Sequence, residues 1–318
     1  MRLRIAAIQL NPLLGKFEEN ASTALRLVDQ IRSKKPDIII FPEMALTGYN
    51  FAGPKQIEPY LEEQGGGRSF EFAKNVSQSL KCHTILGYPE RHSSTTYNSA
   101  MLIGPDGSLV HNYRKSFLYK TDEVWGAKES PTGFEAFDIV INDRKIRSTI
   151  GICMDLNPYK FEAPFEAFEF ANFCLEKQVQ LILVPTAWMS TSWSEDWKDQ
   201  AKYTKLFEQQ LPFEINIESS AANDSILNSL EEAYDRTKPD KRTAQYWLIR
   251  FQPLFFKKHE KMVLVVCNRS GVEGNLMYAG SSSIFRFNGN VYEDGVDLEV
   301  FGTLGQGVEG VLLRDVEI

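Results

Sequence analysis

The stretch STIGICMD, residues 148–155, is a short apolar run that contains a glycine and delivers a thiol at its end. Such runs are typical of buried strands. A buried free cysteine is most often a small hydrophobic side chain of the core, so Cys153 alone does not indicate a nucleophile. Two other apolar runs also stop at an ionisable residue, IIIFPE at Glu43 and VHNYRK at Lys115. Because α/β folds place their sites at strand ends, these three groups could form one site.

The composition is that of an ordinary globular protein, with 318 residues, 43% hydrophobic and 24% charged. The formal net charge of −7 argues against a nucleic-acid partner and is compatible with a substrate that carries a positive charge. No apolar run approaches the roughly 20 residues that span a bilayer, and the opening MRLRI does not resemble a signal peptide. We therefore expect no nucleic-acid and no membrane partner.

The four cysteines show no CxxC spacing, and the four histidines show no HExxH motif. The first observation favours a reducing compartment. The second argues against a metal hydrolase. We predict a cytoplasmic location, with the nucleus as the alternative, and neither a metal nor another cofactor.

Helical and strand patterns alternate through the whole chain, which favours one α/β domain over residues 1–318 with a less regular insertion at about 189–261. The segment 117–133 has no clear period and is predicted to be a loop over the site. Helices are predicted at residues 20–34, 69–80, 164–177 and 245–254, the last bent near Pro253. Strands are predicted at residues 3–10, 37–41, 84–88, 99–103, 108–113, 134–141, 146–153, 181–184, 262–267, 281–287 and 308–316.

Each of the three ionisable residues has a structural and a chemical interpretation. Glu43 is either a hydrated carboxylate beyond the sheet or a general base with a raised pKa. Lys115 is either a solvated strand end or a cation that stabilises developing negative charge. Cys153 needs a neighbouring base or cation before its sulfur can attack. Together the three residues supply a base, an electrostatic stabiliser and a nucleophile.

The motifs FPE at 41–43, YRK at 113–115 and GICMD at 151–155 resemble, in order and spacing, the signature stretches of the nitrilase superfamily of carbon–nitrogen hydrolases. The resemblance implies an α/β fold of four layers, an α-β-β-α sandwich. It also implies that Cys153 is the nucleophile, Glu43 the general base and Lys115 the oxyanion partner.

Two further positions come from the same resemblance. A second Glu of the superfamily lies between the Lys and Cys motifs, and KES at 128–130 makes Glu129 its counterpart. Many members carry Tyr after the nucleophile, where this chain has Met154. The backbone N–H of Met154 can still serve the oxyanion hole, because a side-chain replacement leaves it in place.

Within the superfamily, the stretches FPEMALTGY at 41–49, YRKSFLY at 113–119 and IGICMDLNPYKF at 150–161 resemble fungal members that deamidate N-terminal Asn and Gln. This resemblance implies an amidohydrolase that acts on the N-terminal Asn or Gln of peptides or proteins. Its products would be N-terminal Asp or Glu and ammonia, formed through a Cys thioester. Such products are secondary destabilising residues of the N-degron pathway.

An enzyme of this kind must also read a free α-ammonium, which needs an acidic or carbonyl acceptor near the site. Asp122, Glu123 and Asp155 are candidates by their position in the sequence. For Asp155, a structural role beneath the nucleophile turn is the favoured alternative. Trp125 and Trp188 could wall the substrate pocket, although a Trp beside a strand end is more often part of the core.

Two other functions stay open at this point. A small-molecule ω-amidase of the same superfamily would use the same three catalytic residues. A non-catalytic interaction protein could retain the fold, but an intact set of three site residues argues against it. The preference for Asn or Gln and the oligomeric state are not predicted.

Overall fold

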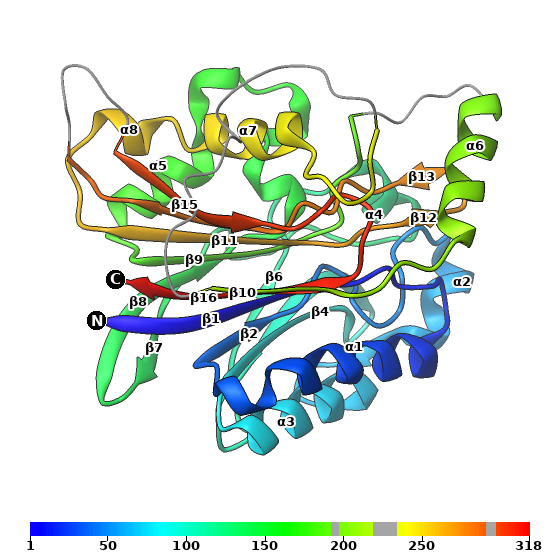
Figure 1. Ribbon diagram of the computed structural model, residues 1–318, viewed down its shortest axis with the longest axis horizontal. Coiled ribbons are helices and arrows are strands. Elements are labelled where there is room, and N and C mark those ends of the chain that lie inside the picture. Colours follow the sequence, from blue (N-terminus) through cyan, green and yellow to red (C-terminus); the bar gives the residue numbers. More distant parts are fainter. Residues whose placement is uncertain (192–196, 219–233, 291–296) are drawn as a thin grey trace.

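Two mixed β-sheets lie face to face at the centre of the computed structural model, which describes residues 1–191, 197–218, 234–290 and 297–318 (Figure 1). The first sheet has the order β10-β16-β1-β2-β4-β5-β6, with β3 paired to β4. Its strands are β1 (Arg2–Gln9), β2 (Ile38–Ile40), β3 (Glu62–Glu63), β4 (His83–His92), β5 (Thr95–Ile103), β6 (Leu109–Arg114), β10 (Glu214–Glu218) and β16 (Gly310–Glu317).

The second sheet has the order β15-β14-β11-β9-β8-β7. Its strands are β7 (Ala136–Ile141), β8 (Arg144–Ile150), β9 (Leu181–Thr186), β11 (Met262–Asn268), β14 (Ser283–Phe287) and β15 (Leu298–Thr303). A separate two-stranded hairpin consists of β12 (Val272–Glu273) and β13 (Leu276–Met277).

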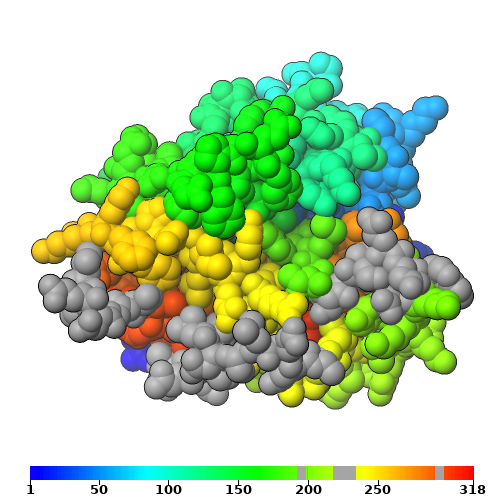
Figure 2. All heavy atoms as spheres, turned by 90° about the horizontal axis from the view of Figure 1, so that it is seen from above, coloured from blue at the N-terminus to red at the C-terminus, as the bar shows by residue number. Residues whose placement is uncertain are grey.

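Helices cover the outer face of each sheet (Figure 1). On the first sheet lie α1 (Phe17–Ile31) and α3 (Gly67–Leu80); on the second lie α5 (Glu169–Glu176), α7 (Lys241–Arg250) and α8 (Pro253–Phe256). Figure 2 shows the second outer layer from above, with the yellow surface of α7 beside the green surface of the middle of the chain. The remaining helices are α2 (Pro54–Ile57), α4 (Lys120–Val124) and α6 (Trp197–Glu208).

The core between the sheets explains why the central strands read as unbroken apolar runs. Buried residues of β1 and β2, such as Ile5 and Ile38, pack in one cluster with Ile150, Leu183 and Val265 of the second sheet. The opposite faces of the same strands pack against the outer helices. A strand covered on both faces has no solvent side to make polar. The arrangement confirms the predicted four-layer α-β-β-α sandwich.

Several elements differ from their predicted form. The predicted loop at 117–133 contains the short helix α4, and the predicted helix at 164–177 reduces to α5 after a 3₁₀ turn at Phe165–Ala167. The predicted strand at 146–153 stops at Ile150, and a 3₁₀ turn begins at Cys153. The helical segment at the end of the insertion does break before Pro253, because proline cannot continue the α7 hydrogen-bond ladder.

Part of residues 189–261 lies outside the described residues, and the described part contains α6, β10, α7 and α8. Here β10 extends the first sheet by pairing with β16 in parallel. In the described part of the chain, no helix is long and apolar enough to span a membrane.

Candidate active site

Four strand ends meet at one edge of the sandwich and bring Glu43, Lys115 and Cys153 together. Glu43 follows β2, Lys115 follows β6, Cys153 follows β8, and Ala187 follows β9. The backbone of Glu43 passes so close to β4 that a Cβ on Gly87 would lie 2.7 Å from the Glu43 Cα. Only glycine permits this approach, so Gly87 helps to set the position of Glu43.

Lys115 joins two carboxylates in the interior. Its Nζ donates to Glu43 Oε1 at 2.8 Å and to Asp122 Oδ2 at 2.6 Å. Asn98 Nδ2 donates to the same two residues, to Glu43 Oε1 at 2.6 Å and to Asp122 Oδ1 at 2.8 Å. The second oxygen of Glu43, Oε2, accepts from the Ala187 N–H at 2.7 Å. All four side chains are fully buried, so a charge-assisted network fixes the carboxylate of Glu43.

The protonation states of Lys115 and Glu43 follow from their burial and from the charges of their neighbours. Burial alone would lower the pKa of Lys115, but the neighbouring carboxylates of Asp122 and Glu43 raise it above its usual value. Lys115 is therefore an ammonium. Burial raises the pKa of Glu43, and the attraction of Lys115 opposes that rise without cancelling it. A carboxylate with a raised pKa is a better proton acceptor than an exposed one.

Cys153 is a neutral thiol at rest, not a preformed thiolate. Burial raises the pKa of Cys153, the negative charge of Glu43 raises it further, and Lys115 only partly opposes these effects. The sequence predicts that a neighbouring base or cation activates this sulfur. Because the pKa stays raised beside Lys115, the cation alone does not suffice, and a base must take the thiol proton as the sulfur attacks.

The backbone at Cys153 has a φ of 44°, in the left-handed region that non-glycine residues rarely adopt. Asp155 holds this turn in place. Its carboxylate accepts from the N–H groups of Ile152 at 2.7 Å, Phe117 at 2.7 Å and Ser116 at 3.1 Å, and from the Tyr113 hydroxyl at 2.8 Å. These contacts favour the structural role for Asp155 over the ammonium-binding role.

Cys153 opens onto a cavity of about 540 Å³. Met154 and Trp188, both predicted at the substrate site, lie in its wall. The rest of the wall is made by aromatic, polar and apolar side chains and by the cation Arg242, and includes Tyr49, Tyr119, Phe161, Tyr246, Asn157, Ser190, Thr191, Thr243, Ala187 and Met189. Among the described residues that line this cavity, none carries a carboxylate. Pockets of this size are typical for small ligands or one end of a chain.

Glu129 does not reach the Lys115 network, which corrects our expectation for the second carboxylate. Its side chain is exposed, and its carboxylate accepts from the Tyr159 hydroxyl at 3.2 Å. The position beside Lys115 belongs to Asp122, which we had predicted as an ammonium ligand. Helix α4 turns Asp122 inward, and the Tyr119 N–H donates to its Oδ2 at 2.9 Å.

Two other predicted substrate residues also lie away from the cavity. Glu123 is exposed on α4, because the residue after an inward-facing Asp122 points to another side of the helix. Trp125 is 1% exposed and packs in a core cluster with Met44, Phe51 and Tyr278. The core alternative for Trp125 is therefore the correct one.

The sequence did not single out Asn98, Ala187 or Tyr49. Asn98 is a fully buried polar residue just before the apolar half of β5, and a polar residue in a buried strand is a signal that could have identified it. Ala187 contributes only its backbone N–H, which leaves no mark in the sequence.

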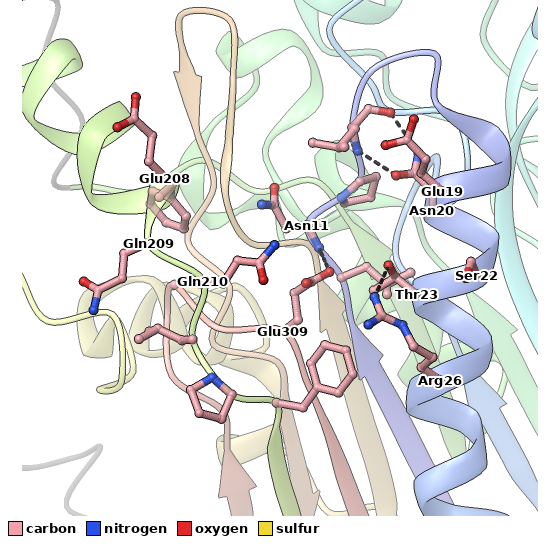
Figure 3. Close-up of a pocket in the computed structure, with 18 of the residues that line it drawn as sticks. Asn11, Glu19, Asn20, Ser22, Thr23, Arg26, Glu208, Gln209, Gln210 and Glu309 are labelled. Carbon is pink, nitrogen blue, oxygen red and sulfur yellow. Dashed lines mark hydrogen bonds between the residues drawn. The ribbon is translucent and has the colours of Figure 1, made fainter.

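A second cavity, of about 890 Å³, lies between the start of α1 and residues 207–213 (Figure 3). Within it, the Asn11 N–H donates to Glu309 at 3.0 Å and Arg26 donates to Thr23 Oγ1 at 2.9 Å. None of the residues that the sequence predicted for the active site lines this second cavity. No cluster of three or more metal-ligating side chains occurs in the described ranges.

Comparisons with known proteins identify the family. The profile of the carbon–nitrogen hydrolase family matches residues 4–157. The protein N-terminal amidase of Saccharomyces cerevisiae is 32% identical to this chain, across 99% of this chain and 95% of the relative. Solved N-terminal amidase structures with an Asn-Glu-Ala and a Gln-Gly peptide superpose with a TM-score of 0.88, at 31% and 30% identity, over 99% of this chain and 97% of theirs. With the strand-end motifs, the fold and this near full-length similarity in agreement, the chain belongs to the carbon–nitrogen hydrolase family.

Proposed function

We propose that this protein is an N-terminal amidase, which hydrolyses the side-chain carboxamide of an N-terminal Asn or Gln and releases ammonia. The observation that carries the proposal is the placement of Cys153 between the buried Glu43–Lys115 pair and a cavity of about 540 Å³. The near full-length similarity to relatives of that name supports the choice of substrate.

In the first step, Cys153 Sγ attacks the carboxamide carbon while Glu43 takes the thiol proton. The negative charge on the carboxamide oxygen is stabilised by the Lys115 ammonium and the Met154 N–H. Glu43 then passes its proton to the departing nitrogen. The C–N bond breaks, ammonia leaves and a thioester to Cys153 remains.

In the second step, water attacks the thioester carbon. Glu43 takes a proton from this water, and the same donors stabilise the oxyanion. The C–S bond breaks, the thiol regains a proton from Glu43, and the peptide leaves with an N-terminal Asp or Glu. No redox partner or cofactor is needed, because the only co-reactant is water.

Asp122 and Asn98 serve this chemistry by positioning Lys115 and Glu43. One ammonium between two carboxylates leaves the buried set with an excess negative charge, which keeps Lys115 protonated through both steps. The Asn98 amide spans the same two carboxylates and restricts the rotation of both.

The α-ammonium of the substrate needs acceptors in the cavity wall, and we infer that Thr191 and Thr243 provide them. Their hydroxyls donate to Asp240 at 3.2 Å and 3.0 Å, so the lone pairs of both oxygens stay available. Asp240 is 7% exposed and places a negative charge behind this part of the wall. Such a site would favour a charged amine over an acetylated one.

An ammonia-release assay tests the proposed function. We expect release from Asn- and Gln-initiated peptides, little release from the N-acetylated Asn peptide, and none with Cys153→Ala. Faster turnover of free glutamine than of the peptides would favour the ω-amidase alternative. Near-normal release by Cys153→Ala would refute the mechanism.

A further inference from the structure

Tyr49 lies in the wall of the catalytic cavity with a hydroxyl that has no hydrogen-bond partner in the part of the chain that the structure describes. The residue is 2% exposed, so solvent does not replace the missing partner. By contrast, the buried hydroxyls of Tyr113 and Tyr278 have partners: Tyr113 donates to Asp155 at 2.8 Å and Tyr278 to Glu273 at 3.0 Å. A buried polar group without a partner is costly and is found at sites that a ligand completes.

The backbone around Tyr49 is fixed by a buried ion pair. The N–H groups of Tyr49 and Asn50 donate to the Glu273 carboxylate at 3.2 Å and 2.6 Å. Arg269 Nη1 donates to the same carboxylate at 2.9 Å, and neither partner of the pair is accessible to solvent. The hydroxyl is therefore presented by a rigid support, not by a mobile loop.

Gly48 permits this support. Its φ is 79°, in the left-handed region, and a Cβ there would lie 2.6 Å from Glu273 Oε1. A larger residue would push Glu273 away from the two N–H groups that it accepts. The sequence TGY thus brings the ring of Tyr49 against the network that begins with Glu43, six residues earlier.

Tyr49 lies close to the groups that take part in the reaction. Lys115 Nζ lies 5.7 Å from the centre of the Tyr49 ring, and Cys153 lines the same cavity. Burial raises the pKa of Tyr49 well above its usual value, and the charges of Asp122 and Glu43 add to this effect. The hydroxyl is therefore a neutral O–H donor over the whole working range of pH.

We propose that the Tyr49 hydroxyl donates a hydrogen bond to the carboxamide oxygen of the substrate, as a third oxyanion donor beside Lys115 and the Met154 N–H. The proposal rests on the proposed amidase function and adds a catalytic residue to it. Tyrosine hydroxyls are suited to this task when a dry site keeps them protonated. The substrate oxygen would supply the partner that the hydroxyl lacks.

The test compares Tyr49→Phe with the wild-type protein in three reactions. Two are hydrolyses of an Asn-initiated peptide and of the matching peptide with the side-chain methyl ester of Asp. The third is alkylation of Cys153 by iodoacetamide, a displacement that develops no oxyanion. The control variant Tyr88→Phe removes an equally buried hydroxyl that donates to Asn112 at 2.9 Å and does not contact the Glu273 support.

We expect Tyr49→Phe to lower kcat on both the amide and the ester by on the order of 100-fold, with alkylation unchanged and Tyr88→Phe close to wild type in kcat. A loss confined to the amide would overturn the proposal, because the contact would then be to the departing nitrogen. An equal loss in alkylation, or no loss at all, would also overturn it. If the wild-type protein itself fails on the peptide, the proposed function is what has failed.

Discussion

At the scale of single residues, the site depends on a charge balance in a dry interior. Lys115 lies between the carboxylates of Glu43 and Asp122, and all three side chains are fully buried in the absence of substrate. Removing one member of such a set leaves the others buried and unpaired, which is costly. The roles of the two carboxylates differ, since only Glu43 also accepts from the Ala187 N–H that follows β9.

The distinction between Asp122 and Glu129 can be tested with two isosteric changes. Asp122→Asn removes one of the two charges that hold the Lys115 ammonium, so kcat for ammonia release should fall by roughly 100-fold, the cost of a displaced oxyanion donor. Glu129→Gln alters an exposed side chain and serves as the matched control with roughly unchanged activity. A large loss with Glu129→Gln and none with Asp122→Asn would restore the original assignment of Glu129.

Glu43→Gln should have opposite effects on amide hydrolysis by Cys153 and on alkylation of its thiol. The variant lacks the base for both steps, so amide hydrolysis should be abolished. Because the charge of Glu43 is one cause of the raised pKa of Cys153, the same change should speed alkylation of this thiol by iodoacetamide. In the wild-type protein, alkylation should accelerate as the pH rises above neutrality. Fast, pH-independent alkylation of the wild type would contradict a neutral resting thiol.

At the scale of elements, short or tertiary-dependent features escaped the sequence. Helix α4 has five residues, too few to produce a helical period, and it is stabilised by the contact of Asp122 with the Tyr119 N–H. Strand β10 is an edge strand with charged ends, and its pairing with β16 involves residues almost 100 positions away. By contrast, central strands such as β2, β9 and β11 were predictable, because burial on both faces makes them uniformly apolar.

The residues of the candidate site were predictable where they follow a central strand, but their tertiary contacts were not. Glu43, Lys115 and Cys153 each follow a strand that is recognisable in the sequence. Because α/β folds place their sites at strand ends, the three residues could be predicted to lie together. The link between Asp122 and Lys115 depends on the turn of α4, and the left-handed backbone of Cys153 depends on contacts of Asp155 with residues 116 and 117. Contacts of this kind are set by the tertiary fold and have no local pattern.

Helix α7 offers a test at this scale, because its N-cap also supports the cavity wall. Asp240 accepts from the Thr243 N–H at 3.1 Å, so Asp240→Ala should lower the free energy of unfolding in urea by about 1–2 kcal/mol. Asp240→Asn keeps an N-cap side chain but loses the charge. This variant should retain more stability and kcat while its KM for a free-amine peptide rises. An unchanged KM would remove Asp240 from substrate recognition.

At the scale of the whole molecule, distant parts of the chain are tied together across the first sheet. Strand β1 pairs along its whole length with β16, and Arg4 donates to Asp315 at 2.7 Å. The inter-sheet core also includes Cys153, which packs against it, so the nucleophile is anchored to residues of both sheets.

Buried carboxyl groups should make stability depend on pH. Burial raises the pKa of Asp155 to about 6, against hydrogen bonds that lower it, whereas an unfolded Asp has a pKa of about 3.9. The folded state therefore binds more protons at this group between these values, and the contribution of Asp155 to the free energy of unfolding should fall by roughly 3 kcal/mol as the pH rises from about 4 to about 6. Burial shifts the pKa of Glu62 and Glu309 in the same direction.

Glu90 acts in the opposite sense at lower pH. Burial alone would raise the pKa of Glu90, but hydrogen bonds from Arg114 and Ser99 lower it below its usual value. The stabilisation by ionised Glu90 is therefore lost as the pH falls below the pKa of an unfolded Glu. Burial also lowers the pKa of His83 and His111, which act in this sense because their unfolded forms bind more protons as the pH falls.

The contribution of Asp155 is therefore tested by comparing the wild type with Asp155→Asn, which cannot ionise. As the pH rises from 5 to 7.5, the free energy of unfolding in urea should change less favourably for the wild type than for Asp155→Asn. Equal changes in the two proteins would contradict the raised pKa of Asp155.

The most direct test of the central claim is intact-mass spectrometry of the protein after a rapid acid quench during turnover of an Asn-initiated peptide. The account predicts an adduct equal to the peptide minus one ammonia, located on Cys153 by digestion and absent from Cys153→Ala. Ammonia release without any adduct, together with release by Cys153→Ala, would contradict covalent catalysis at this strand end.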